Sequence, residues 1–214
     1  MNNNQRKKRK GNRKNLPPED LFDKPQDYYK GEILKQYTHS KSLMRIQERL
    51  TKRALNIISP ECPSLVLDLG AGCGFSASYL YLNNFSVISL DLIFKMLIEY
   101  DISELNPINA DMKFLPFREN SFDYIFSISA IQWIINKFPI EKLKKILIQM
   151  SMDLKRVLKP NGKCIIQFYP KDESILKEMG IIFSDYGKFE GHFIIDNPNS
   201  LIKKRYYLYL KNNK

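Results

Sequence analysis

Three aspartates are spaced so that they can meet at one end of a β-sheet. Asp68 lies in an apolar run that leads into the glycine-rich turn 70–74, and Asp91 and Asp111 follow the next two apolar runs. Glycine has no Cβ, so its backbone can turn tightly and a ligand can approach it closely. In an open α/β sheet, the carboxyl ends of neighbouring parallel strands line one crevice. The sequence therefore predicts a binding crevice bordered by three carboxylates and a glycine turn.

These side chains favour a ligand with hydroxyl groups, an amine and a positively charged end. A carboxylate accepts hydrogen bonds from both hydroxyls of a ribose, which suits Asp91, and Asp111 suits the exocyclic amine of an adenine. Residues 72–77 satisfy the dinucleotide pattern GxGxxA, but Asp68 would place an anion beside a pyrophosphate. The amino and sulfonium groups of S-adenosylmethionine fit that anion better. The alternative is a glycine turn that only packs a helix against a strand.

Apolar runs predict the strands that hold this crevice. Runs without polar alternation are typical of strands buried on both faces, and their alternation with helices indicates a parallel sheet with right-handed crossovers. Two later runs joined by the turn 197–200 predict an antiparallel hairpin at one edge. The expected strands cover residues 64–69, 85–90, 108–110, 122–129 and 163–169, with 193–195 and 206–210 in the hairpin.

Helical spacing of apolar residues predicts two long helices. One covers residues 43–58 and ends before Pro60, and the other covers residues 143–158 and ends at the turn 159–162. The first precedes the sheet, so residues 19–60 are expected to form a helical cap and residues 61–214 the ligand-binding domain.

Composition excludes several classes of protein. With 214 residues and 43% hydrophobic residues, the chain can bury the core of one globular domain. No apolar run approaches the ~20 residues of a membrane span, so we expect no membrane association. Three cysteines without CxxC spacing support neither a disulfide framework nor a zinc cluster, and a reducing compartment is expected.

Positive charge is concentrated at the N-terminus. The formal net charge is +11, and residues 1–15 hold seven basic side chains and no acid. Such a segment repels itself and buries nothing, so residues 1–18 are predicted to form a disordered basic tail. The tail could solubilise the chain, direct it to the nucleus or grip nucleic-acid phosphates. These alternatives stay open.

Two short stretches, Ser-Ile-Ser-Ala-Ile-Gln-Trp at 127–133 and Gln-Phe-Tyr-Pro-Lys at 167–171, are more specific than the glycine turn. With the turn and the segment Leu-Pro-Phe-Arg at 115–118, they resemble the class I S-adenosylmethionine-dependent methyltransferases. The narrower resemblance is to the eukaryotic family that methylates guanine N7 in small-subunit (18S) rRNA. It implies a Rossmann-like sheet of seven mostly parallel strands, helices on both faces and a C-terminal antiparallel hairpin.

The resemblance implies a set of cofactor contacts. Asp68, the glycines and Ser127 would hold the methionine end, and Tyr37 would close over its carboxylate. Leu92 would pack on the adenine beside Asp91, and Met112 would cover the ring face beside Asp111. The full set is Tyr37, Asp68, Gly70, Gly72, Gly74, Asp91, Leu92, Asp111, Met112 and Ser127.

Methylation of guanine N7 needs no general base, because N7 carries a free lone pair in the base plane. We therefore assign no catalytic residue and no metal. Trp133 could stack on an extruded guanine, with Tyr169 and Pro170 as the other wall and Gln132 at the guanine edge. The alternatives are a core tryptophan and a proline that only stiffens its loop.

The family also implies a partner and a place in the cell. Its members pair with a small zinc-binding activator subunit that adds a strand beside the third strand of the sheet. Here Ile108, Phe114, Leu115 and Phe117 would leave an apolar edge, or would instead pack under the first long helix. The expected location is nucleus, nucleolus and cytoplasm. Two other functions stay open: a small-molecule methyltransferase, and a ribosome-assembly factor with dispensable methylation.

Overall fold

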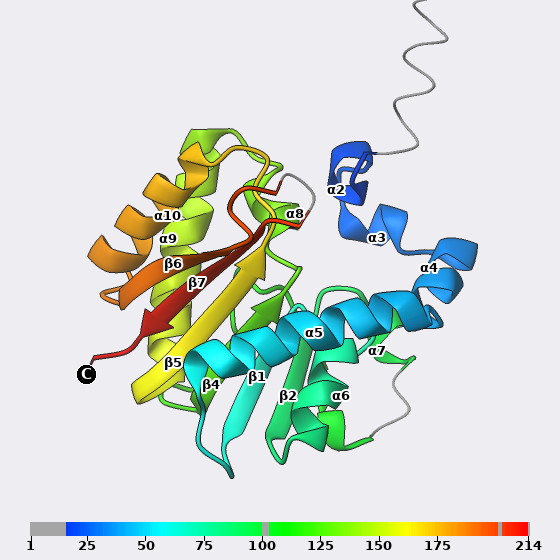
Figure 1. Cartoon of the computed structure of the whole chain (residues 1–214), viewed down its shortest axis with the longest axis horizontal. Helices are drawn as coiled ribbons and strands as arrows, with labels where there is room; N and C mark the ends of the chain where they lie inside the picture. The colour runs from blue at the N-terminus through cyan, green and yellow to red at the C-terminus, as the bar shows by residue number, and fades with distance from the viewer. Residues whose placement is uncertain (1–15, 100–102, 201–202, 214) are drawn as a thin grey trace, which may run out of the picture.

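A seven-stranded sheet runs through the centre of the protein (Figure 1). The computed structural model describes residues 16–99, 103–200 and 203–213, so the basic run at 1–15 lies outside the described residues. The strand order is β3-β2-β1-β4-β5-β7-β6, and β7 alone runs against its neighbours β5 and β6. The strands are β1 (Leu65–Leu69), β2 (Ser86–Asp91), β3 (Pro107–Asn109), β4 (Phe122–Ile128), β5 (Leu158–Phe168), β6 (Glu190–Asp196) and β7 (Arg205–Lys211).

Helices cover both faces of the sheet. On one face, α9 and α10 pack on the side chains of Leu67, Ile125 and Ile166, and on the other face α5 and α6 pack on Val66, Phe126 and Ile165. Neighbouring residues of one strand thus enter opposite cores, which explains the unalternated apolar runs. The helices are α2 (Pro18–Leu21), α3 (Pro25–Tyr28), α4 (Gly31–Thr38), α5 (Lys41–Ile58), α6 (Phe75–Leu82), α7 (Phe94–Leu97), α8 (Gln132–Ile135), α9 (Ile140–Val157) and α10 (Ser174–Asp185), with a 3-10 turn η2 (Ser103–Leu105).

The predicted fold class is confirmed: a mostly parallel seven-stranded sheet, covered on both faces, with an antiparallel pair at its C-terminal edge. Strand β5 begins earlier than expected, at Leu158, because the predicted turn 159–162 continues the strand. The hydrogen bond from the Asn161 amide to the Asn212 carbonyl, 2.7 Å long, ties this segment to the chain after β7. Helix α10 was not predicted.

The strand order reverses at the centre of the sheet. Strand β1 pairs with β2 on one side and with β4 on the other, and all three run parallel. The chain therefore leaves β1 and β4 toward opposite faces, and a crevice opens at their carboxyl ends. In Figure 1, α2 to α4 lie beyond the carboxyl ends of the central strands, with α2 facing α8.

Within the described ranges, no helix is long and apolar enough to span a bilayer.

Candidate functional site

A cleft of about 620 Å³ lies at the carboxyl ends of the central strands. Its walls come from the turn after β1, the end of β2, the loops after β3 and β4, and the helical segment from α3 to α4. A volume of this size suits a small-molecule ligand. Of the residues expected from the sequence, the cleft is lined by Tyr37, Gly70, Gly72, Asp91, Leu92, Asp111, Met112 and Trp133.

The glycine turn is shaped by a close contact with the loop after β4. Gly70 has a φ of +82°, and a Cβ at this position would lie 2.3 Å from the Cβ of Ala130. Both the backbone angle and the space therefore require glycine. The amides of Gly70 and Ala71 both donate to the carbonyl of Leu90, at 2.8 and 3.0 Å, so the turn is joined to β2.

Asp91 joins the turn to the end of β2 through its side chain. Its Oδ2 accepts from the Gly72 amide at 2.8 Å, and its Oδ1 accepts from the Ile93 amide at 2.8 Å. Burial raises the pKa of Asp91, while these hydrogen bonds act in the opposite direction. Each carboxylate oxygen has two lone pairs, so the side chain can still accept from a ligand.

Asp111 is paired with a lysine, unlike Asp91, whose carboxylate accepts only from backbone amides within the fold. Its Oδ1 accepts from the Lys113 amide at 3.0 Å, and its Oδ2 lies 3.0 Å from the Lys113 ammonium. The neighbouring Met112 reaches across the cleft floor, because its Cε would lie 2.9 Å from a Cβ on Gly70. Asp111 and Met112 thus face the glycine turn from the loop after β3.

Asp68 lies behind the cleft surface rather than on it. It is fully buried, and its Oδ2 accepts from the Ser76 hydroxyl at 2.5 Å. Its Oδ1 has no hydrogen-bond partner in the described residues. Burial raises the pKa of Asp68 to about 7, with Ser76 lowering it and Asp91 raising it further. Ser76 lines the cleft, so its hydroxyl stands between the carboxylate of Asp68 and a ligand bound in the cleft.

The structure does not bring every expected residue into the cleft lining. The Ser127 hydroxyl donates to the Leu69 carbonyl at 2.8 Å, and the buried Gln132 amide donates to the Ser129 carbonyl at 2.7 Å. Tyr169 instead lies under the Arg205 guanidinium, 5.2 Å from ring centroid to Cζ. These three side chains thus have contacts within the fold, although the buried Oε1 of Gln132 has no hydrogen-bond partner in the described residues. Asp68, Gly74, Ser127, Gln132, Tyr169 and Pro170 are not among the lining residues.

The cleft lining includes Asp23, Tyr29 and Lys137, which were not expected from the sequence, besides the expected Tyr37. The ring of Tyr29 lies 6.0 Å from Trp133, and the ring of Tyr37 stacks on Phe75 at 6.0 Å. About a hundred residues separate Tyr29 from Trp133, so no local spacing in the sequence could have revealed the contact.

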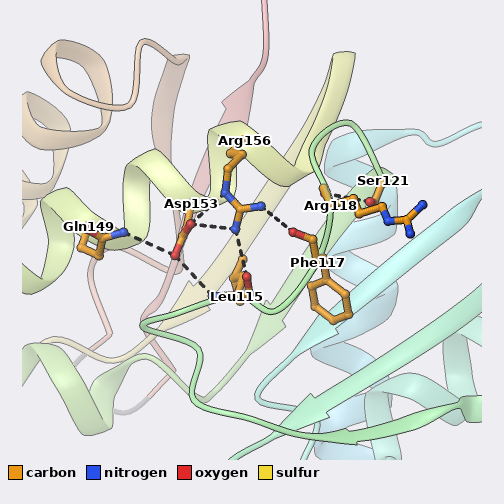
Figure 2. A network of polar contacts seen from close by, with 7 residues as sticks. All are labelled: Leu115, Phe117, Arg118, Ser121, Gln149, Asp153 and Arg156. Atoms are coloured by element: carbon orange, nitrogen blue, oxygen red, sulfur yellow. Dashed lines mark hydrogen bonds and ion pairs between the residues drawn. The ribbon is translucent and has the colours of Figure 1, made fainter.

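A partly buried polar network holds the loop that carries Asp111 and Met112 (Figure 2). Arg156 on α9 donates to the carbonyls of Phe117 and Leu115, at 2.5 and 2.9 Å, and pairs with Asp153 at 2.8 Å. Asp153 in turn accepts from the Leu115 amide at 3.3 Å. Two side chains on one helix therefore fix three backbone groups of the segment 115–117, which lies just after the cleft wall.

Within the described part of the chain, no three His, Cys, Asp or Glu side chains form a group that could hold a metal ion. The arrangement instead suits an organic ligand, held by backbone amides, carboxylates and aromatic rings.

Fold and cleft together define a class I methyltransferase. Residues 67–166 match the model of a methyltransferase domain family. The structure is similar to a Haemonchus contortus phosphoethanolamine N-methyltransferase bound to S-adenosylhomocysteine, with a TM-score of 0.65, 16% identity and coverage of 88% of this chain and 60% of that one. A Haloferax volcanii methyltransferase, in complex with the Trm112 methyltransferase activator, gives a TM-score of 0.64 at 16% identity, covering 89% of this chain and 98% of that one.

The sequence relatives define the family more narrowly. The chain is 30% identical to the 18S rRNA (guanine-N(7))-methyltransferase bud23 of Schizosaccharomyces pombe, over 87% of this chain and 71% of that protein. It is 34% identical to the 18S rRNA (guanine(1575)-N(7))-methyltransferase of Saccharomyces cerevisiae, over 86% of this chain and 68% of that protein. The chain belongs to the 18S rRNA (guanine-N(7))-methyltransferase family.

Asp68 gives the ligand-free protein a pH-dependent stability. An exposed Asp has a pKa of about 3.9, whereas burial raises that of Asp68 to about 7. Between these values the folded state binds more protons, so the free energy of unfolding falls as pH rises from about 4 to about 7. Asp68→Asn should gain stability relative to wild type over this interval, as measured by urea unfolding at pH 5, 6 and 7. The exposed Asp185→Asn is the control. If the difference in free energy of unfolding between Asp68→Asn and wild type is the same at all three pH values, the raised pKa of Asp68 is wrong.

Replacement of Arg156 by lysine should loosen the cleft wall. The single nitrogen of a lysine cannot occupy the separate positions of the Nε, Nη1 and Nη2 atoms that make these contacts. Arg156→Lys should therefore lower the free energy of unfolding by about 1–2 kcal/mol and weaken cofactor binding several-fold. Urea unfolding and calorimetric titration with S-adenosylhomocysteine measure the two effects. Arg118→Lys, in the exposed part of the same loop, is the matched control, and equal cofactor affinity in both variants would rule out the positioning role.

Proposed function

We propose that this chain transfers a methyl group from S-adenosylmethionine to N7 of a guanine in small-subunit rRNA. The observation that carries the proposal is the membership in a family whose relatives are 18S rRNA (guanine-N(7))-methyltransferases, at 28–34% identity over most of the chain. The cleft, with its glycine turn and carboxylates, is of the size and kind that this cofactor requires.

The residues present fit the cofactor. Asp91 has acceptor capacity for the two ribose hydroxyls, and Asp111 stands at the next strand end for the adenine amine. Leu92 and Met112 offer apolar contact to the adenine ring, and Tyr37 stands over the opposite wall. The glycine turn lets the methionine end approach the backbone, with Asp68 supplying negative charge from behind Ser76. The bound cofactor supplies an electrophilic methyl group on its sulfonium.

The protein's part in the reaction is to position the base and to keep water out. Guanine N7 attacks through a lone pair that is already free, so no side chain has to remove a proton. Aligning the two partners in one cleft supplies most of the required rate gain. Trp133 and Tyr29 present aromatic faces at the rim, where an extruded guanine can stack.

An activator subunit at the free edge of β3 completes the proposal. Strand β3 pairs only with β2 in the described sheet. Helix α7, which contacts β3, carries Phe94 and is capped by Ile98, and Phe114 follows β3; 60%, 60% and 65% of their surface is exposed. Leu115 and Phe117, expected on the same edge, instead pack into the core beside Phe122. The remaining apolar side chains suit strand addition by a partner. A Haloferax volcanii methyltransferase of similar fold is in complex with the Trm112 activator, which supports an activator subunit as the partner.

The proposed location follows from the proposed substrate. An enzyme acting on small-subunit rRNA during assembly would work in the nucleolus and nucleus, and travel with the particle to the cytoplasm.

Loss of Asp91 should abolish methylation at the level of cofactor binding. Asp91→Ala removes hydrogen bonds to a charged acceptor worth about 1.5–3 kcal/mol, so S-adenosylhomocysteine affinity should fall roughly 10- to 100-fold. Calorimetry measures that affinity, and reductive cleavage of small-subunit RNA at N7-methylguanosine measures the product. The exposed Asp185→Ala is the control. Transfer of label from the cofactor only to metabolites, with no cleavable site in the RNA, would contradict the proposed substrate.

The activator should be needed for solubility. Expressed alone, the chain should aggregate through its exposed edge, and coexpression with a Trm112-type subunit should yield a soluble complex. Phe114→Asp should prevent copurification, while Met152→Asp, an exposed position on α9, should not. A monodisperse chain with full cofactor affinity in the absence of any partner would refute the role of this edge.

A further inference from the structure

An ion pair joins the two sides of the cleft mouth. Asp23 comes from the segment between α2 and α3, and Lys137 follows α8; both line the cleft. The Asp23 Oδ1 and the Lys137 Nζ lie 2.6 Å apart. Lys137 also donates to the carbonyl of Phe22 at 3.1 Å. The ammonium is thereby fixed beside the carboxylate.

Both groups keep capacity for a further partner. The Asp23 side chain is 90% exposed, and a carboxylate has about four acceptor positions, of which the ammonium occupies one. The ammonium has three donor hydrogens, and two are used. The hydrogen bond from Lys137 lowers the pKa of Asp23, so the carboxylate is ionised at neutral pH. The cleft mouth thus presents one donor directly next to two acceptors.

We propose that Asp23 and Lys137 select the target base by its Watson–Crick edge. The carboxylate accepts from the N1–H and N2–H₂ groups of guanine, and the ammonium donates to O6. This inference rests on the proposed function and deepens it, because it names the residues that discriminate guanine from the other bases.

The order of donors and acceptors fits guanine alone among the four bases. Along its Watson–Crick edge guanine presents acceptor, donor, donor, which complements the ammonium and the two carboxylate oxygens. Cytosine presents donor, acceptor, acceptor, and would place an amine against Lys137 and two acceptors against Asp23. Adenine offers no pair of donors, and uracil offers a single donor between two acceptors.

The neighbouring aromatic ring and the position of N7 agree with this orientation. Trp133 lies four residues before Lys137 and lines the same cleft, so one short segment supplies a stacking face and an edge contact. N7 belongs to the five-membered ring, away from the N1 and N2 groups. A guanine held at the mouth by those groups can therefore turn N7 inward, toward the glycine turn and the methyl donor.

The same pair also links the α2–α3 segment to the body, and this second role needs to be separated in the test. A purely structural link would affect the binding of every base equally. Base selection changes the ratio of the affinities for guanosine and inosine, which differ only by the 2-amino group.

The test measures binding of three labelled pentanucleotides by fluorescence anisotropy. Each is an oligouridylate with guanosine, inosine or adenosine at its centre, titrated against the full chain copurified with its activator and saturated with S-adenosylhomocysteine. Wild type should bind the guanosine oligomer at least about fivefold more tightly than the other two. Asp23→Asn should bring the guanosine-to-inosine ratio close to one. Asp27→Asn, an exposed position of α3 with the same change of charge, should keep the wild-type ratio.

The other outcomes either overturn the inference or separate it from the proposed function. Equal binding of the three oligomers by wild type, no binding of any of them, or an equal loss for all three in Asp23→Asn would assign the pair a structural role only. Methylated rRNA together with equal guanosine and inosine affinities would reject the base contact and leave the proposed function intact. An Asp23-dependent preference without methylation of rRNA would reject the function and leave the base site.

Discussion

The close packing of Gly70 against Ala130, where β1 and β4 end side by side, is the contact on which the site depends. A single Cβ at Gly70 would lie 2.3 Å from the Ala130 side chain, so the two loops can meet only with glycine there. This approach directs the chain after β1 toward β2, where Leu90 accepts from the turn and Asp91 holds Gly72. The crevice at the strand reversal, the backbone amides at its floor and the orientation of Asp91 all follow from this one contact.

Three carboxylates near that turn have three different electrostatic environments. Burial raises the pKa of Asp68 to about 7, Asp91 is buried but held by two amides, and Asp111 is paired with Lys113. Burial makes the ionised forms of Asp68 and Asp91 unfavourable, because the carboxylates lose contact with water. A cationic ligand would stabilise these ionised forms. The site is thus suited to a ligand whose positive charge lies near the glycine turn, as the sulfonium and amino groups would in the proposed binding of S-adenosylmethionine.

The cleft has two halves that come from different parts of the chain. The cofactor half is built from the strand ends of the sheet, and the Arg156 network holds its outer loop against α9 (Figure 2). The half proposed for the base combines Asp23 and Tyr29, on either side of α3, with Trp133 and Lys137 from α8 and the residues after it. Figure 1 shows α2 facing α8. A shared cofactor site and a variable cap is a common way to adapt one fold to different substrates.

The sequence by itself determined the central strands, because β1, β2 and β4 are largely apolar runs, and it placed Asp68, Asp91 and Asp111 near or just beyond strand ends. Tertiary structure decided the rest. The fold gives the Ser127 hydroxyl a hydrogen bond to the Leu69 carbonyl and the Gln132 amide one to the Ser129 carbonyl, and the sequence predicted neither contact. The sequence did not reveal Asp23, Tyr29 or Lys137 as site residues. Their contacts form only in the folded chain, between segments about a hundred residues apart. Local pattern specifies elements and their ends, whereas contacts between distant segments depend on packing that no short window of sequence contains.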